Sequence, residues 1–317
     1  MLLGRGLFEV AAVSAGILIC AIVLRPRRKR RSTLPRRVVF IRHGQSQGNA
    51  TTKTKQAYRE QPDHAIELTE QGHAEARTAG ATLSALMAAD RTSGRVKFFC
   101  SPHARTAQTL ASLRTAIPDD SVTGDVTFDD LLRELNRGFF QQTFETVTLY
   151  AAQRDEHGIA HYRYPGHDSL LDVNQRMGCF LNGLVAFMAA GRLSPDDSIV
   201  VVSHGAALLQ LMGRLVGFGA PAAARKNLPN CCVLVFERFE LDELERSDGT
   251  KHSATYYAPT PATHRMLGTT ALLGPRCAAS MGVLSDAEAD AQFADEARLA
   301  ARTLALALHP GLCFTSV

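Results

Sequence analysis

The stretch RVVFIRHGQSQGN, residues 37–49, is the most informative part of the sequence. Arg37 to Arg42 is a short run rich in β-branched and aromatic side chains that stops just before Gly44, which is typical of a buried strand. This strand would deliver Arg42 and His43 to its carboxyl end. Ligands of open α/β sheets bind beyond the carboxyl ends of the strands, so a functional site is expected there.

Strand and helix patterns alternate along the rest of the chain. Further strands are expected over residues 96–101, 126–128, 198–203 and 231–239, and helices over 69–89, from 102, over 169–189 and from 205. Such alternation forms a mainly parallel sheet that is covered on both faces. We therefore predict an α/β protein, a three-layer α/β/α sandwich with a mainly parallel central sheet, plus an N-terminal transmembrane helix. The segment 134–168 is expected to be irregular and to cap the site.

Two other expected strands also end in polar groups, Ser101–Arg105 and Ser203–Gly205. Phosphoryl transfer requires positive charge around three equatorial oxygens, and arginine pairs with phosphate oxygens bidentately. A neutral imidazole is a nucleophile near neutral pH because its free pKa is about 6.5. A carboxylic acid must protonate the leaving oxygen, and Glu134 follows the expected strand 126–128 at a position suited to this role. These residue types predict phosphoryl transfer.

The order of these motifs resembles the signature of the histidine phosphatase superfamily, to which the cofactor-dependent phosphoglycerate mutases belong. The similar segments lie in the family's order within residues 36–240. They are VFIRHGQSQGN from Val39, LTEQGHAEA from Leu68, SPHARTAQT from Ser101, the pair Arg133-Glu134, and VSHG from Val202.

The resemblance implies a metal-independent phosphomonoesterase that works without a cofactor and acts on a phosphorylated small molecule or a phosphoprotein. It also implies a role for each matching residue. His43 would be the nucleophile and Glu134 the proton donor. The phosphoryl group would be held by Arg42, Arg105, His204, Asn49 and the amide of Gly205.

Residues 64–69, 133–140 and 164–176 look most similar to a plant and fungal group, the phosphoglycerate mutase-like proteins or broad-range acid phosphatases. The mutases carry a tryptophan-rich stretch after the first histidine, and this chain has no tryptophan. Asn136-Arg137 and Gly166-His167 depart from the group's pattern, so the substrate stays open. A phosphoglycerate-type mutase and a catalytically silent adaptor that binds a phosphorylated partner remain alternatives.

Residues 7–24 are apolar apart from Glu9 and Ser14, and a basic run, Arg25–Arg31, follows them. Eighteen helical residues reach ~27 Å, just short of the hydrocarbon core of a bilayer. The charge bias would keep the C-terminal side in the cytosol. We expect a single-pass anchor in the endoplasmic reticulum or the mitochondrial outer membrane. A cleaved or mitochondrial targeting segment is the alternative.

The net charge of +4 is unevenly distributed. Residues 1–37 hold nine Lys or Arg against the single Glu9, which gives +8 and leaves −4 for the other 280 residues. The basic character is therefore local, and no nucleic-acid partner is expected. Seven cysteines, an odd number without metal-ligand spacing, predict reduced thiols. The expected domains are an anchor with its basic run (1–37), the phosphatase domain (38–240) and an Ala-rich, partly helical extension (241–317).

Overall fold

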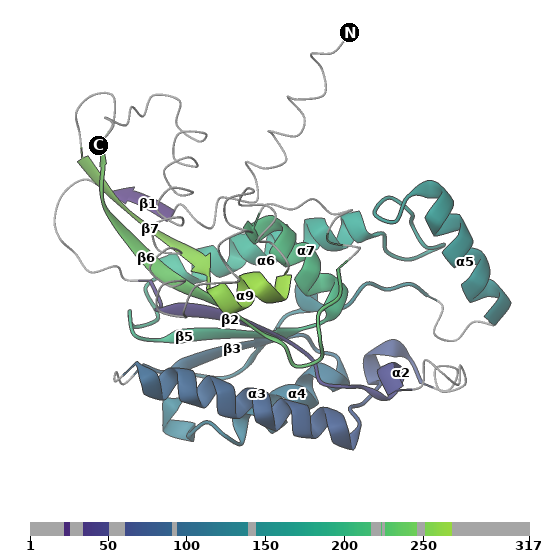
Figure 1. The fold of residues 1–317 in the computed structure, drawn as a ribbon, viewed down its shortest axis with the longest axis horizontal. Coiled ribbons are helices and arrows are strands. Elements are labelled where there is room, and N and C mark those ends of the chain that lie inside the picture. The colour runs from purple at the N-terminus through teal and green to yellow at the C-terminus, as the bar shows by residue number, and fades with distance from the viewer. Residues whose placement is uncertain are drawn as a thin grey trace, which may run out of the picture.

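A computed structural model describes residues 22–25, 34–50, 61–90, 94–138, 144–216, 223, 226–245 and 251–267. Within these ranges seven strands form one sheet in the order β1-β7-β6-β2-β5-β3-β4 (Figure 1). The strands are β1 (Ile22–Arg25), β2 (Arg37–Arg42), β3 (Val96–Cys100), β4 (Thr127–Phe128), β5 (Ser198–Ser203), β6 (Val233–Glu245) and β7 (Lys251–Pro259).

The α/β class is confirmed, but the sheet is mixed rather than mainly parallel. The pairs β2–β5, β5–β3 and β3–β4 are parallel, whereas β2–β6, β6–β7 and β7–β1 are antiparallel. Only five residues separate β6 from β7. So short a connection joins antiparallel strands, because a parallel pair needs a crossover of a dozen residues or more.

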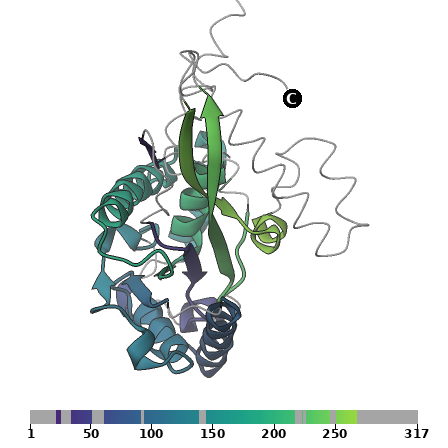
Figure 2. The same ribbon diagram turned by 90° about the vertical axis from the view of Figure 1, so that its left-hand side faces the viewer.

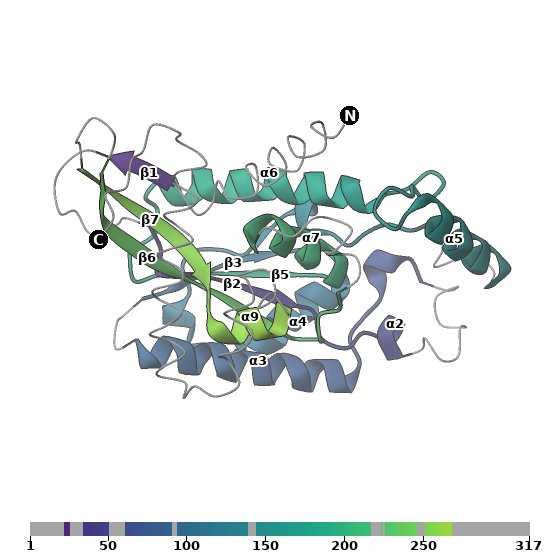
Figure 3. The same cartoon turned by 45° about the horizontal axis from the view of Figure 1, so that its top comes forward.

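Helices cover both faces of the sheet (Figures 1 and 3). They are α2 (Gln47–Ala50), α3 (Glu70–Ala89), α4 (Ala104–Arg114), α5 (Phe144–His157), α6 (Leu170–Ala189), α7 (Gly205–Val216) and α9 (Pro261–Leu267). In β2, Val38 and Phe40 are buried in the core that includes α6 and α7, while Val39 and Ile41 are buried in the core that includes α3 and α4. Burial on both faces explains the unbroken apolar run of this strand.

Two helix starts follow from local chemistry and hold the site in place. Thr69 caps α3 by accepting a hydrogen bond from the Gly72 amide, and Ser169 and Asp172 form a capping box on α6. A Cβ at Gly72 would lie 2.1 Å from the carbonyl oxygen of Gln45. Glycine therefore allows the first turn of α3 to press against the loop that follows β2.

Two parts of the chain differ from the predicted organisation. The segment 134–168 was expected to be irregular, yet it contains the 14-residue helix α5. The expected domain boundary at residue 240 falls inside β6, and the β6–β7 hairpin extends the sheet beyond it (Figure 2). Thr263 of α9 accepts a hydrogen bond from the Val235 amide at 2.7 Å, so this helix is tied to β6. Residues 268–317 lie outside the described part of the chain.

Most of the predicted membrane anchor, residues 7–21, also lies outside the described residues. Its last three residues, 22–24, belong to β1, which pairs with β7 through Ile22 opposite Thr255 and Arg25 opposite Ser253. These three residues are therefore extended rather than helical. Among the described helices, none combines the length and the apolar character needed to cross a membrane.

Candidate active site

A pocket of about 360 Å³ lies at the carboxyl ends of the parallel strands. Register brings two predicted motifs together there, because Arg42 at the end of β2 is opposite Ser203 at the end of β5. Six of the seven predicted site residues line the pocket: Arg42, His43, Asn49, Arg105, Glu134 and Gly205. The seventh, His204, is fully buried, and its ring centroid lies 5.2 Å from that of His43.

The His43 side chain is only 3% exposed, and its tautomer follows from one contact. Nδ1 lies 2.7 Å from the carbonyl oxygen of Gly44, which can only accept a hydrogen bond. The proton is therefore assigned to Nδ1, and Nε2 keeps its lone pair. Burial, followed by the charges of Arg105 and Arg42, holds the pKa of His43 well below its usual 6.5. The imidazole is thus neutral and nucleophilic at neutral pH.

Two further imidazoles, those of His204 and His103, lie close to the site. Nε2 of His204 is 2.8 Å from the Ser101 hydroxyl, while Nδ1 has no hydrogen-bond partner among the described residues. The His103 ring is buried and lies 4.8 Å from that of His204. Burial, with Arg105 next, lowers the pKa of His204 well below 6.5 and that of His103 to about 4.

The two predicted phosphate-binding arginines have different partners. Arg42 donates to the Leu228 carbonyl oxygen, and its Nε has no partner among the described residues. Arg105 is bound by Asp63: Nη1 lies 2.6 Å from the main-chain oxygen and 3.2 Å from Oδ1, and Nη2 lies 3.3 Å from Oδ2. Both terminal nitrogens of Arg105 are therefore occupied by a residue that also lines the pocket. The sequence motifs contain no signal for this ion pair.

Glu134 and Gly205 lie next to each other at the pocket wall. The Glu134 carboxylate accepts hydrogen bonds from the amides of Leu135 at 2.8 Å and of Ala206 at 3.3 Å. A Cβ at Gly205 would lie 3.3 Å from Nε of Arg42. Glycine at this position therefore leaves space for the Arg42 side chain. Gly205 also starts α7, and the partial positive charge of a helix N-terminus favours an anion in the pocket.

Asn49 lies on α2, at the C-terminal end of the sequence motif that includes Arg42 and His43. Its Oδ1 accepts hydrogen bonds from the Ser46 amide at 3.3 Å and from the Ser46 hydroxyl at 3.2 Å. Ser46 lines the pocket as well. This local network holds the predicted phosphate-contacting side chain of Asn49 at the pocket.

The outer part of the pocket consists of residues that the motifs did not identify. Three are cationic: Arg137, Arg154 and Lys226. Apolar and aromatic side chains, including Ile159, Tyr164 and Leu209, also line the pocket. Arg154 is on α5, whose helical structure was not predicted, which is why its place at the pocket could not be deduced. In the described part of the chain, no group of three His, Cys, Asp or Glu side chains has the arrangement of a metal site.

Four cysteines lie in the described part of the chain. Cys100, Cys179, Cys231 and Cys232 are all free. Burial raises the pKa of the Cys100 thiol to about 12 and that of Cys232 to about 11. These two buried side chains are therefore poor nucleophiles at neutral pH.

Comparison with known proteins points to one family. Residues 38–243 match the model of the histidine phosphatase superfamily (branch 1). Phosphoglycerate mutase-like protein AT74 of Arabidopsis thaliana is 36% identical over 178 residues, which are 54% of this chain and 55% of that protein. AT74H of the same plant is 35% identical over 181 residues, or 54% of this chain and 63% of AT74H. The matched region thus spans little more than half the length of these relatives.

A solved structure shares the fold. Mycobacterial hydrolase 1 has a TM-score of 0.50 and 23% sequence identity, over 64% of this chain and 92% of its own. At that identity the likeness concerns the architecture alone.

Proposed function

The chain belongs to the histidine phosphatase superfamily, as its sequence motifs predict, and we propose that it is a metal-independent phosphomonoesterase with a phosphohistidine intermediate on His43. One observation carries this proposal. The bond from Nδ1 to the Gly44 carbonyl leaves Nε2 of a buried, neutral His43 unprotonated in a pocket that also holds Arg42 and Arg105. A nucleophile and positive charge for the equatorial oxygens are the main requirements of phosphoryl transfer.

In the first step, the Nε2 lone pair of His43 forms a bond to phosphorus and the phosphorus–oxygen ester bond breaks. The leaving oxygen takes a proton from the Glu134 carboxyl group, because an alkoxide is a poor leaving group. Ser101 can donate to Nε2 of His204, which leaves Nδ1 of that ring as a hydrogen-bond donor for the phosphoryl oxygens.

In the second step, a water oxygen attacks phosphorus and the phosphorus–nitrogen bond breaks. The Glu134 carboxylate takes a proton from that water, so the enzyme returns to its starting protonation state and inorganic phosphate leaves. The substrate we propose is a phosphorylated small molecule. The outer pocket offers apolar contacts at Ile159 and Tyr164 and positive charge at Arg154 to the part that remains after phosphate is removed.

The test uses the purified full chain with a generic phosphomonoester and with phosphoglycerate. We expect release of inorganic phosphate and an acid-labile phosphoenzyme, both abolished in His43→Ala. His157→Ala is the matched control, since His157 is exposed and does not line the pocket. Isomerisation of phosphoglycerate without release would indicate a mutase, and binding without turnover an adaptor. Normal turnover by His43→Ala would exclude the proposed mechanism.

We also propose that the N-terminal apolar segment tethers the protein to a membrane, with the pocket facing the cytosol. The apolar run of residues 7–24 and the basic run after it support this proposal. With residues 22–24 in β1, the remaining 15 residues would form a helix of ~22 Å, shorter than the ~30 Å hydrocarbon core, so the bilayer would have to thin around it. The full chain should stay in the membrane pellet after alkaline washing, whereas a variant that lacks residues 1–21 should not. Release by salt alone would contradict insertion.

A further inference from the structure

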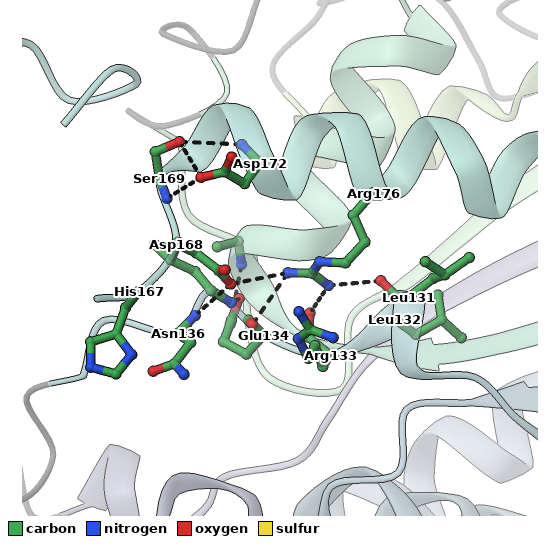
Figure 4. Close-up of polar contacts among 12 residues, drawn as sticks. Leu131, Leu132, Arg133, Glu134, Asn136, His167, Asp168, Ser169, Asp172 and Arg176 are labelled. Carbon is green, nitrogen blue, oxygen red and sulfur yellow. Dashed lines mark hydrogen bonds and ion pairs between the residues drawn. The ribbon is translucent and has the colours of Figure 1, made fainter. Parts of the chain in front are cut away.

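Arg176 of α6 is a buried charged residue that the proposed mechanism does not use. Its side chain is only 9% exposed and points toward the segment that leads to Glu134 (Figure 4). Nη1 donates to the carbonyl oxygens of Leu131 and Arg133, both at 2.7 Å, and Nη2 donates to the carbonyl oxygen of Glu134 itself at 3.4 Å. One guanidinium group thus binds three carbonyls within four consecutive residues.

Asp168 completes this network on the other side of Glu134. One carboxylate oxygen, Oδ2, lies 3.5 Å from Nη2 of Arg176 and accepts a hydrogen bond from the Asn136 amide at 3.1 Å. The Asp168 amide donates to the Asn136 carbonyl oxygen at 3.0 Å. The main chain is therefore held before Glu134 by Arg176 and after it by Asp168.

The start of α6 fixes both residues that hold this segment. Ser169 and Asp172 form the capping box, in which Oδ2 of Asp172 accepts from the Ser169 amide and from its hydroxyl, both at 2.6 Å. Asp168 is the residue immediately before this cap, and Arg176 lies two turns into the helix. Through these contacts, the position of helix α6 determines the position of the irregular segment that contains Glu134.

The Glu134 segment needs such support. Residues 133–137 belong to neither a helix nor a strand. The regular main-chain hydrogen bonds of a helix or sheet therefore do not fix the position of Glu134 in the pocket. Burial, followed by the charge of Arg133, lowers the pKa of Arg176. Burying this charged guanidinium group therefore costs free energy. An apolar side chain could fill the same space but could not bind carbonyl oxygens.

We propose that Arg176, itself bound by Asp168, is a positioning residue for Glu134. It holds the Glu134 carboxyl group at the position from which a proton can reach the leaving oxygen. This inference rests on the proposed role of Glu134 as proton donor, so the test has to separate the two.

The test compares kcat/KM for an alkyl phosphate with kcat/KM for 4-nitrophenyl phosphate, whose leaving group hardly needs a proton. A positioned general acid contributes about 10²- to 10⁴-fold. Glu134→Gln should lose activity mainly on the alkyl ester. Arg176→Lys should show the same selectivity, with a loss of roughly 10-fold or more on the alkyl ester and at most about threefold on the nitrophenyl ester. The double variant should add no further selective loss.

Arg163→Lys is the matched control. Arg163 is exposed and binds Asp172 and the His167 carbonyl at the same helix start, but it does not contact the Glu134 segment. If Arg176→Lys does not fold, Asp168→Asn tests the same network and should show a smaller selective loss. Glu134→Gln selectivity together with an equal loss on both esters in Arg176→Lys or Asp168→Asn would overturn the positioning role. Equal losses in Glu134→Gln would instead overturn the proposed proton donor.

Discussion

Lowering the pH from 7 to 5 should destabilise the folded domain through three imidazoles that are buried as neutral groups. Burial, with the charge of Arg105 next, lowers the pKa of His43 and His204 well below 6.5 and that of His103 to about 4. In the unfolded chain each of them has a pKa of about 6.5. Below that pH the unfolded state binds more protons than the folded state, so the free energy of unfolding decreases as the pH falls.

The size of the effect follows from the number of buried imidazoles. Each contributes about 1.4 kcal/mol per pH unit below 6.5, until the pH reaches the pKa of the folded state. At pH 5 this is ~2 kcal/mol for His103, whose folded-state pKa is about 4, and the lowered pKa values of His43 and His204 add losses of the same sign; total stability is roughly 5–15 kcal/mol. Carboxylates such as Asp172 lose their contribution at lower pH. Its burial opposes ionisation, but hydrogen bonds from Ser169 and Arg163 lower its pKa to about 2.

Urea unfolding followed by circular dichroism at constant ionic strength, between pH 7 and pH 5, measures this loss. His103→Asn removes one of the three groups without changing a residue that lines the pocket. Between pH 6.5 and pH 5 the pH slope of its unfolding free energy should be smaller than that of the unsubstituted chain by up to about 1.4 kcal/mol per pH unit. A free energy of unfolding that is the same at pH 7 and pH 5 would refute the reasoning, and so would an unchanged slope in His103→Asn.

Three other outcomes are expected. Asp63→Asn removes the negative charge paired with Arg105 but keeps the main-chain contact, so inorganic phosphate should inhibit about tenfold more strongly, a change of about 1.4 kcal/mol, whereas the exposed Asp119→Asn should leave inhibition unchanged. Gly72→Ala should lower the free energy of unfolding by about 1–3 kcal/mol because its Cβ meets a carbonyl oxygen, whereas Gly183→Ala has open space and should raise it by about 0.5–1 kcal/mol; thermal melting that ranks them the other way contradicts this packing. Arg154→Met should raise KM for phosphoesters with a second negative charge more than for those without one, and equal changes would exclude charge recognition at the outer pocket.

The central part of the fold could be predicted because its signals are local. A continuous apolar run marks β2 and β5, and the side chains that follow each run must lie at the same sheet edge once the strands are parallel. Thr69 and Ser169 mark two helix starts through capping, which needs only a few neighbouring residues. Of the predicted site residues, Arg42, His43, His204 and Gly205 end or directly follow such an apolar run.

The remaining features depend on contacts between distant parts of the sequence. Asp63 binds Arg105 across 42 positions, and Arg176 binds the Glu134 segment across a similar distance. No pattern in one sequence marks such pairs. Helix α5 was missed for a different reason. It leaves Leu149 54% exposed, so its side chains do not show the one-sided apolar pattern by which helices are recognised.

Burial gives this site a nucleophile and also makes it sensitive to acid. The low pKa of His43 keeps Nε2 unprotonated at pH values where a free imidazole would be charged, so the chemistry itself tolerates mild acid. The same burial applies to His103 and His204, and below pH 6.5 it weakens the fold. A phosphate bound to Arg42 and Arg105 would offset part of that loss, because a ligand that binds only the folded state stabilises it. The acid limit of activity should therefore move to lower pH when phosphate is present, since unfolding, rather than protonation of the nucleophile, sets that limit.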